Sequence, residues 1–193
     1  MNSKPSSSLP LNRREFLLGC SALSLAGCAT LKPAARDAVV DTHTHFYDPS
    51  RPQGVPWPDK NDRVLYRPVL PAELKPMARP LGISGTIVVE ASPWEEDNQW
   101  VLDLAAREPF ILGLVGHLKP GRPGFEQYLE RFTRQPLFLG VRTGLWNITV
   151  APDDPQFIRD LRLVAKHNLA LDLIVGPEEL DLAARIAAAV PDL

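Results

Sequence analysis

Cysteine, long apolar runs and surplus positive charge are all scarce in this chain of 193 residues. Its two cysteines, Cys20 and Cys28, are too few for a disulfide-dense small secreted protein. The 21 basic residues are nearly matched by 23 acidic ones, so no excess of positive charge favours binding to nucleic acid or to an anionic membrane. A hydrophobic fraction of 45% excludes a disordered or collagen-like chain. The length is typical of one globular domain.

The longest apolar stretch near the start, residues 16–26, is too short to span a bilayer, which takes about 20 residues. It has the length of a signal-peptide core. Arg13 and Arg14 precede it, and paired arginines followed by Phe-Leu resemble a twin-arginine export signal. The stretch leads into Leu-Ala-Gly-Cys, which resembles a lipoprotein signal-peptidase site with Cys28 as the lipidated residue.

We therefore expect residues 1–27 to be a signal peptide, residues 28–37 a linker behind the lipidated Cys28, and residues 38–193 the folded domain. The expected location is the periplasm after twin-arginine export, with the membrane contacted only through the lipid on Cys28. The alternative is an ordinary cleavage site that happens to contain a cysteine. If Cys20 is removed with the signal and Cys28 is lipidated, neither a disulfide nor a thiol nucleophile remains.

Five nearly continuous apolar runs follow, a pattern typical of strands buried on both faces of a parallel sheet. The runs are residues 39–42, 83–90, 111–115, 137–141 and 169–175. Segments with apolar residues at helical spacing lie between the later runs. This alternation predicts βα units and a parallel sheet.

Two of the helical segments have recognisable starts. Ser92 and Glu95 have the spacing of a capping box, with Pro93 at the first helical position. Asp154 and Pro155 combine a capping residue with a proline in the same way. We therefore expect helices to begin at both places.

Residues 46–80 interrupt the alternation with a proline-rich segment of little regular pattern. Long irregular segments in a compact domain are usually binding loops or lids. Trp57 and Tyr66 give this segment apolar contact surface. This favours the interpretation that the segment is a lid that covers a binding site. An inert surface excursion is the alternative.

The sharpest chemical signal is the sequence Asp-Thr-His-Thr-His that ends in His43 and His45. Side chains two residues apart on a strand point to the same side. Two imidazoles so placed can bind one divalent ion, and the carboxyl end of a parallel strand is where barrel enzymes build active sites. The alternative is a pair of ordinary loop residues, or a pair that orders the following loop by hydrogen bonds.

Residues 40–49 (VDTHTHFYDP) resemble the opening strand of the amidohydrolase superfamily. More narrowly, they are similar to the amidohydrolase-related branch that contains sugar lactonases, a pyrone-dicarboxylate hydrolase and metal-dependent TIM-barrel hydrolases. The resemblance spans residues 38–193 and continues in the blocks TIVVEAS, NQWVL, LVGH, LGVR and LDLIV.

The resemblance implies a (β/α)₈ barrel that hydrolyses a lactone, or a related ester or amide, of a small polar molecule. It also implies one divalent metal ion, with zinc the favoured metal. His43 and His45 match the family's metal-binding motif, so the resemblance implies that they are its ligands. Some members of the branch work without metal and use the same histidines to bind substrate. The resemblance places the general base in later strands, so no catalytic base is assigned.

Four further residues are candidates for substrate binding because of where they lie. Glu90 closes the second predicted strand, and His117 and Arg142 follow the third and fourth, where a barrel directs side chains at its ligand. Arg142 offers a planar fork suited to a carboxylate or an oxyanion. Trp57 lies in the expected lid. The alternatives are a solvated carboxylate, a buried histidine, a structural ion pair and an ordinary loop residue.

An eight-stranded barrel takes about 250 residues, whereas only five strands are predicted here. The expected fold is therefore an α/β TIM-type barrel truncated after about five βα units, the front part of a longer hydrolase. One alternative is a non-catalytic or vestigial half-barrel that binds a partner. Another is a metal-free hydrolase or decarboxylase of the same superfamily with a carboxylate substrate.

Overall fold

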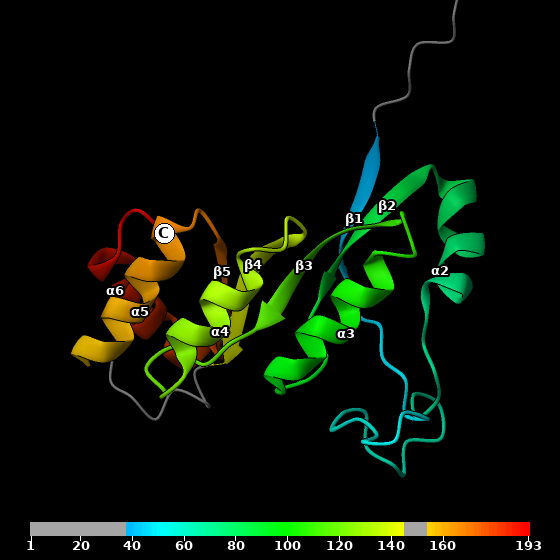
Figure 1. The fold of residues 1–193 in the computed structure, drawn as a ribbon, viewed down its shortest axis with the longest axis horizontal. Helices are drawn as coiled ribbons and strands as arrows, with labels where there is room; N and C mark the ends of the chain where they lie inside the picture. The colour runs from blue at the N-terminus through cyan, green and yellow to red at the C-terminus, as the bar shows by residue number, and fades with distance from the viewer. Residues whose placement is uncertain (1–37, 145–153) are drawn as a thin grey trace, which may run out of the picture. The chain divides into compact units, whose positions relative to one another are not determined.

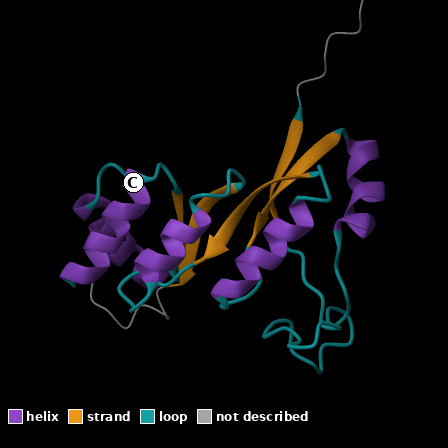
Figure 2. Cartoon of the chain, in the orientation of Figure 1, coloured by secondary structure: helices purple, strands orange, loops and turns teal. Residues whose placement is uncertain are grey.

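Five parallel strands, hydrogen-bonded in chain order, form the sheet on which the domain is built (Figures 1 and 2). The computed structural model describes residues 38–144 and 154–193. The strands are β1 (Val39–Thr44), β2 (Ile83–Val89), β3 (Ile111–His117), β4 (Phe138–Gly144) and β5 (Ala170–Ile174). All five predicted strands are confirmed, with ends that differ by three residues or fewer. The sheet is the expected α/β barrel wall of five βα units.

The predicted export signal, residues 1–27, lies outside the described residues. The same is true of Cys28 and of the linker, residues 28–37. None of the helices in the described part of the chain is long and apolar enough to cross a bilayer.

Helices follow β2, β3, β4 and β5, and the first three lie along the same side of the sheet (Figures 1 and 2). They are α3 (Glu95–Ala105), α4 (Phe125–Phe132), α5 (Pro155–Lys166) and α6 (Leu180–Ala189), with a short 3₁₀ turn, η3 (Pro177–Glu179), before the last. Asp154 caps α5 as predicted, because its carboxylate accepts hydrogen bonds from the backbone N–H groups of Gln156 and Phe157. This satisfies two of the four unpaired donors at the helix start.

The predicted capping box at the start of α3 is wrong. The helix begins at Glu95, its N-cap is Trp94, and no side chain caps it. The Ser92 hydroxyl instead accepts a hydrogen bond from the Trp94 N–H at 3.2 Å, which forms a turn before the helix. Pro93 therefore lies in this turn and not at the first helical position.

The main core lies between the sheet and helices α3 and α4. Phe125, Leu129 and Phe132 of α4 are buried at the helical spacing read from the sequence, against Leu114 and Val141 of the sheet. A smaller cluster joins α5 to α6 and contains Phe157, Ile158, Leu161, Ile186 and Val190. The apolar faces of the helices thus pack against one side of the sheet. The ends of the strands do not belong to this packing and remain available for a site.

Residues 46–80 are more regular than predicted. They contain α2 (Pro71–Ala78), followed by the 3₁₀ turn η1 (Arg79–Leu81). The prolines of this segment predicted an irregular loop. Proline is tolerated at a helix start, however, because the N–H that it lacks would have no partner there. Pro71 begins α2 in this way. Before α2, Tyr47 and Val69 exchange backbone hydrogen bonds at 3.1 and 2.9 Å. This bridge closes the base of the loop 48–68.

A buried ion pair holds this loop against α3. The two Nη atoms of Arg51 donate hydrogen bonds to the two carboxylate oxygens of Asp97 at 3.0 and 3.1 Å. The side chains are only 8% and 13% exposed. The Arg51 guanidinium also lies 4.6 Å from the centre of the Trp100 ring, within the range of a cation–π contact. The loop is therefore fastened at its base and again at α3.

We predict that Arg51→Ala frees the loop 48–68, because it leaves the buried Asp97 carboxylate without its partner. Truncating one member of a buried pair is strongly destabilising. In the full chain, chymotryptic cleavage after Leu65 and Tyr66 should become about tenfold faster. Mass spectrometry of the fragments locates the cuts.

Glu73→Ala is the matched control. It breaks an exposed ion pair with Arg67 in the same segment without changing a residue beside the cleaved bonds, and exposed pairs contribute little. Its cleavage rate should stay near that of the wild type. Equal rates for the two variants would contradict an anchoring role of Arg51.

Candidate active site

β1 has an irregularity in the stretch that contains His43. Asp41 is paired with Thr86 and Thr44 with Val88, so β1 has one residue more than β2 over this stretch. The extra residue makes a β-bulge, a feature that commonly redirects side chains beside active sites. The Asp41 carboxylate accepts a hydrogen bond from the His43 N–H at 3.1 Å, which gives this displaced amide a partner.

His45 follows β1 and is held in one tautomer. Its Nδ1 lies 2.9 Å from the carbonyl oxygen of Val89. Because a carbonyl can only accept, Nδ1 carries the proton and Nε2 keeps its lone pair. Burial lowers the pKa of His45, and the charges of His43 and Arg142 lower it further, against the hydrogen bond to Val89. The ring is therefore neutral near pH 7, the state that binds metal.

His43 contacts His45 and also Arg142, which lies on β4. The centres of the His43 and His45 rings are 5.1 Å apart, with the planes at 79°. His43 Nε2 also lies 3.1 Å from an Nη atom of Arg142. β1 and β4 are separated by two strands in the sheet, so this contact requires the sheet to curl until their carboxyl ends meet.

An open pocket of ≈ 710 Å³, a volume that includes solvent at its mouth, lies beside these residues. Its lining residues are His45, Trp57, Glu90, Ala91, Arg142 and Ile174. Burial raises the pKa of Glu90, while the Arg142 guanidinium and the N–H of Ser92 oppose the shift. A carboxyl group in this state holds its proton closer to neutral pH than an exposed glutamate. The pocket thus combines an imidazole, a carboxyl group and a guanidinium.

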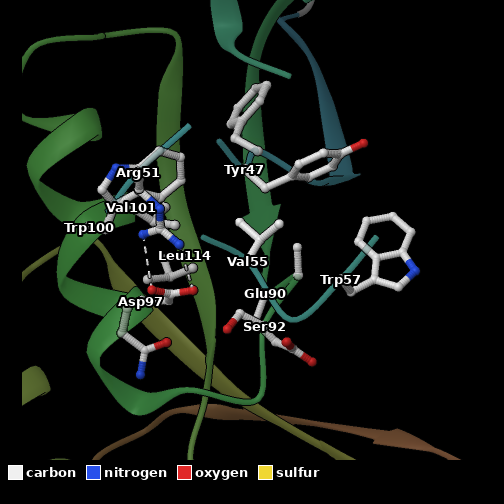
Figure 3. Close-up of a pocket in the computed structure, with 13 residues that line it drawn as sticks. Tyr47, Arg51, Val55, Trp57, Glu90, Ser92, Asp97, Trp100, Val101 and Leu114 are labelled. Atoms are coloured by element: carbon white, nitrogen blue, oxygen red, sulfur yellow. Dashed lines mark hydrogen bonds and ion pairs between the residues drawn. The ribbon is translucent and has the colours of Figure 1, made fainter. Parts of the chain in front are cut away.

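Trp57 belongs to the loop 48–68 and covers one side of this pocket. Its ring lies 6.1 Å from that of His45 and 5.3 Å from that of Tyr47, both edge to face. The side chain remains 43% exposed. Trp57 and Glu90 also line an adjoining pocket, which the Arg51 side chain borders (Figure 3). Trp57 of the expected lid therefore forms part of the wall of the pocket.

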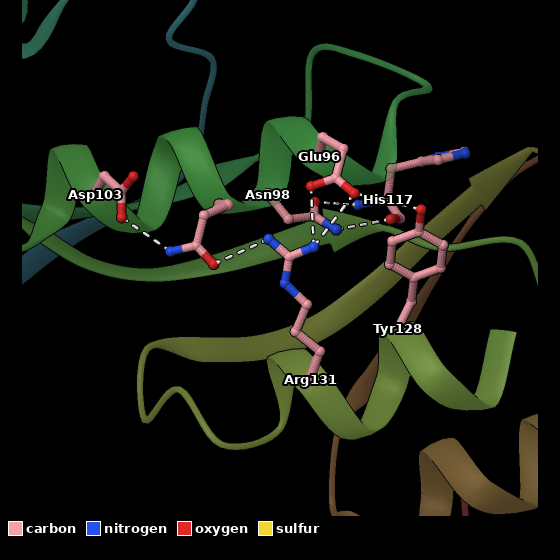
Figure 4. A network of polar contacts seen from close by, with 7 residues as sticks. Glu96, Asn98, Asp103, His117, Tyr128 and Arg131 are labelled. Atoms are coloured by element: carbon pink, nitrogen blue, oxygen red, sulfur yellow. Dashed lines mark hydrogen bonds and ion pairs between the residues drawn. The ribbon is translucent and has the colours of Figure 1, made fainter. Parts of the chain in front are cut away.

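His117 lies apart from this group. Its side chain does not line the open pocket, and the residue is only 2% exposed. The Asn98 amide pairs with both the N–H and the carbonyl of His117 at 2.8 Å, which ties the end of β3 to α3 (Figure 4). His117 Nε2 is buried and has no hydrogen-bond partner among the described residues.

The structure thus brings together five of the six residues proposed from the sequence for metal or substrate binding, namely His43, His45, Glu90, Arg142 and Trp57. The role of the Asp41 carboxylate as an acceptor for the His43 N–H was not predicted from the sequence. Its position two residues before His43 was the available signal, since short polar side chains commonly bond nearby backbone N–H groups. The Arg51–Asp97 pair was also missed, and its separation of 46 residues gives no local signal.

His43 and His45 fit the first two ligands of a divalent ion. The observation that supports this is the tautomer of His45, whose Nε2 lone pair is left available by the hydrogen bond at Nδ1. Within residues 38–144 and 154–193, no group of three or more His, Cys, Asp or Glu side chains is arranged to hold a metal. The described part of the chain therefore offers two imidazoles beside a carboxyl group.

Stability should fall in acid because of His117. Burial lowers its pKa to about 4, and nearby Lys119 adds to the shift. The unfolded side chain has a pKa of about 6.5, so between these values the unfolded chain binds a proton that the folded one does not. The stabilisation is complete above about pH 6.5 and is lost progressively down to about pH 4, by about 3 kcal/mol.

Urea unfolding of the full chain at pH 4.5, 5.5 and 7 measures this loss. His117→Gln should give a flatter dependence of the unfolding free energy on pH than the wild type. His167→Gln, at an exposed position, is the control and should leave the slope unchanged. Identical slopes for wild type and His117→Gln would contradict the assignment.

Comparison with known proteins finds curated relatives of this chain. Two curated proteins named L-fucono-1,5-lactonase are similar to this chain. The protein from Burkholderia ambifaria is 29% identical over 156 residues, which is 80% of this chain and 53% of that protein. The one from Burkholderia multivorans is 25% identical over 144 residues, covering 73% and 48%. The chain thus spans about half the length of the curated relatives it matches.

Solved structures show the same partial coverage. An amidohydrolase from Burkholderia multivorans with bound zinc superposes with a TM-score of 0.68 at 24% identity, over 80% of this chain and 55% of that one. Amidohydrolase 2 from Bifidobacterium longum subsp. infantis gives 0.62 at 26% identity, over 81% and 58%. A family model described as amidohydrolase matches residues 40–193. Since this match covers most of the sequence, the chain belongs to the amidohydrolase family.

Proposed function

We propose that the site is that of a metal-dependent lactonase acting on a small polar cyclic ester. The observation that carries this proposal is the convergence of His45, Glu90 and Arg142 on one open pocket at the carboxyl ends of parallel strands. The lactonase names of the curated relatives and the zinc in one solved relative support it. Hydrolysis adds water to the ester carbonyl, breaks its bond to the ring oxygen and yields a hydroxy acid.

His43 and His45 are the residues that would hold the divalent ion, and zinc suits a site of neutral imidazoles. Such an ion, when bound, polarises an ester carbonyl and lowers the pKa of bound water towards 7. The hydrogen bond from His45 Nδ1 to the Val89 carbonyl fixes the ring so that Nε2 faces away from the strand. That bond is the second-layer support that metal-binding histidines usually have.

The other residues of the pocket handle the substrate. Because burial raises the pKa of Glu90, its carboxyl group can exchange a proton nearer neutral pH than an ordinary glutamate, and it can also bond ring hydroxyls. Arg142 offers donors to a carboxylate or a developing oxyanion. Trp57 presents an apolar face against which a ring can pack. These roles need no movement of the loop, since the Arg51–Asp97 pair already holds it in place.

Hydrolysis of L-fucono-1,5-lactone by the full chain in the presence of zinc tests this proposal. The acid released is followed with a pH indicator, and the spontaneous rate is subtracted. His45→Ala should lower kcat/KM by about 100-fold or more, because it removes a metal ligand and one wall of the pocket. His167→Ala, at an exposed position, is the control and should keep the wild-type rate.

Removal of metal with a chelator should abolish the activity, and added zinc should restore it. No hydrolysis above the spontaneous rate with any metal would contradict the lactonase proposal. Full activity after chelation would contradict its metal dependence and favour the alternative of a metal-free hydrolase. Equal rates for wild type and His45→Ala would place the chemistry elsewhere.

We also propose that the protein is exported and anchored by lipid at Cys28. This rests on the arginine pair and the Leu-Ala-Gly-Cys sequence. Expressed in a bacterium with twin-arginine export, the wild type should sediment with membranes, whereas Cys28→Ser should not, because the lipid attachment is lost. Cys20→Ser, within the expected signal peptide, should behave as the wild type. Equal membrane fractions for the two variants would contradict the anchor.

A further inference from the structure

The contact between Arg142 and His43 has a direct consequence for metal binding. A guanidinium has five N–H donors and no acceptor, so at 3.1 Å His43 Nε2 must be the acceptor. Its lone pair therefore points at Arg142, and Nδ1 carries the ring proton. This is the lone pair that a metal ion would need from Nε2.

Arg142 is not satisfied where it lies. Its Nε is buried and has no hydrogen-bond partner in the described part of the chain. Glu90 is close enough for the guanidinium to lower its pKa, yet none of the ion pairs among the described residues joins the two. The guanidinium is therefore held in the pocket by a neutral ring, with a donor left unused.

Charge repulsion prevents Arg142 and a divalent cation from occupying His43 Nε2 at the same time. A divalent cation on His43 Nε2 would stand beside a guanidinium that is now 3.1 Å from the same atom, and like charges at such distances repel each other. His45 is different, because its Nδ1 is bonded to the Val89 carbonyl and its Nε2 keeps its lone pair. Among the described residues, Arg142 is thus the group that competes with a metal for His43.

We propose that Arg142 and a divalent cation are alternative partners of His43 Nε2, so that metal loading releases the guanidinium into the open pocket. Arg142 is then a positioning residue that holds His43 in the metal-free protein. Once displaced, it is free to use its unpaired donors on a carboxylate or oxyanion, which it binds best through two parallel hydrogen bonds. The proposal rests on the metal site of the proposed function.

Zinc titration of the full chain by calorimetry tests this without any assay of activity. Arg142→Met removes the charge and the donors and keeps the length, and it should lower the zinc Kd about tenfold or more. Arg142→Lys keeps the charge and should stay within about threefold of the wild type. Arg107→Met, which removes an exposed arginine in the turn after α3, is the control and should not change the Kd.

His43→Ala shows whether the effect passes through His43. On that background, Arg142→Met should improve zinc affinity by less than threefold, because the contested lone pair is gone. If Arg142→Met folds poorly, Arg142→Gln serves in its place, and ¹⁵N chemical shifts of His43 report which ring nitrogen changes when zinc is added.

An unchanged or weaker zinc affinity of Arg142→Met would overturn the proposal, and so would the absence of zinc binding by every variant. An improvement that is equally large without His43 would also overturn it. Tighter zinc binding by Arg142→Met in a protein without lactonase activity would contradict the proposed function only. Zinc-dependent lactonase activity with an unaffected Kd would contradict this inference only.

Discussion

The parallel pairing of the strands in chain order is the constraint on which the site depends. It brings the carboxyl ends of all five strands to one edge, so residues far apart in the sequence meet there. The curl of the sheet then brings β1 and β4 close enough for His43 Nε2 to lie 3.1 Å from an Nη atom of Arg142. In a flat sheet of the same order, β1 and β4 would lie three strand spacings apart, which is about 14 Å.

The strands and most helices could be predicted from the sequence because their signals are local. Apolar runs of strand length mark β1 to β5, and the cap at Asp154 marks a helix start. The carboxyl ends of those strands then pointed to His45, Glu90 and Arg142 as neighbours. Periodicity and parallel topology together therefore suffice to place these residues at one edge.

The features that the sequence did not predict depend on tertiary contacts or on competition between local bonds. Ser92 can cap a helix or close a turn, and only the position of α3 decides that it closes a turn. The Arg51–Asp97 pair joins a loop to a helix across 46 residues. His117 follows the rule for a strand-end residue, yet the packing of α3 against β3 buries it away from the open pocket.

X-ray absorption of the full chain loaded with one equivalent of zinc tests most directly whether the two histidines form a metal site. We predict two imidazole nitrogens at about 2.0–2.1 Å from the metal in the wild type. The doubly substituted His43→Ala, His45→Ala protein should lose this signature. A spectrum without imidazole ligands in the wild type, or one that the double substitution leaves unchanged, would contradict the account.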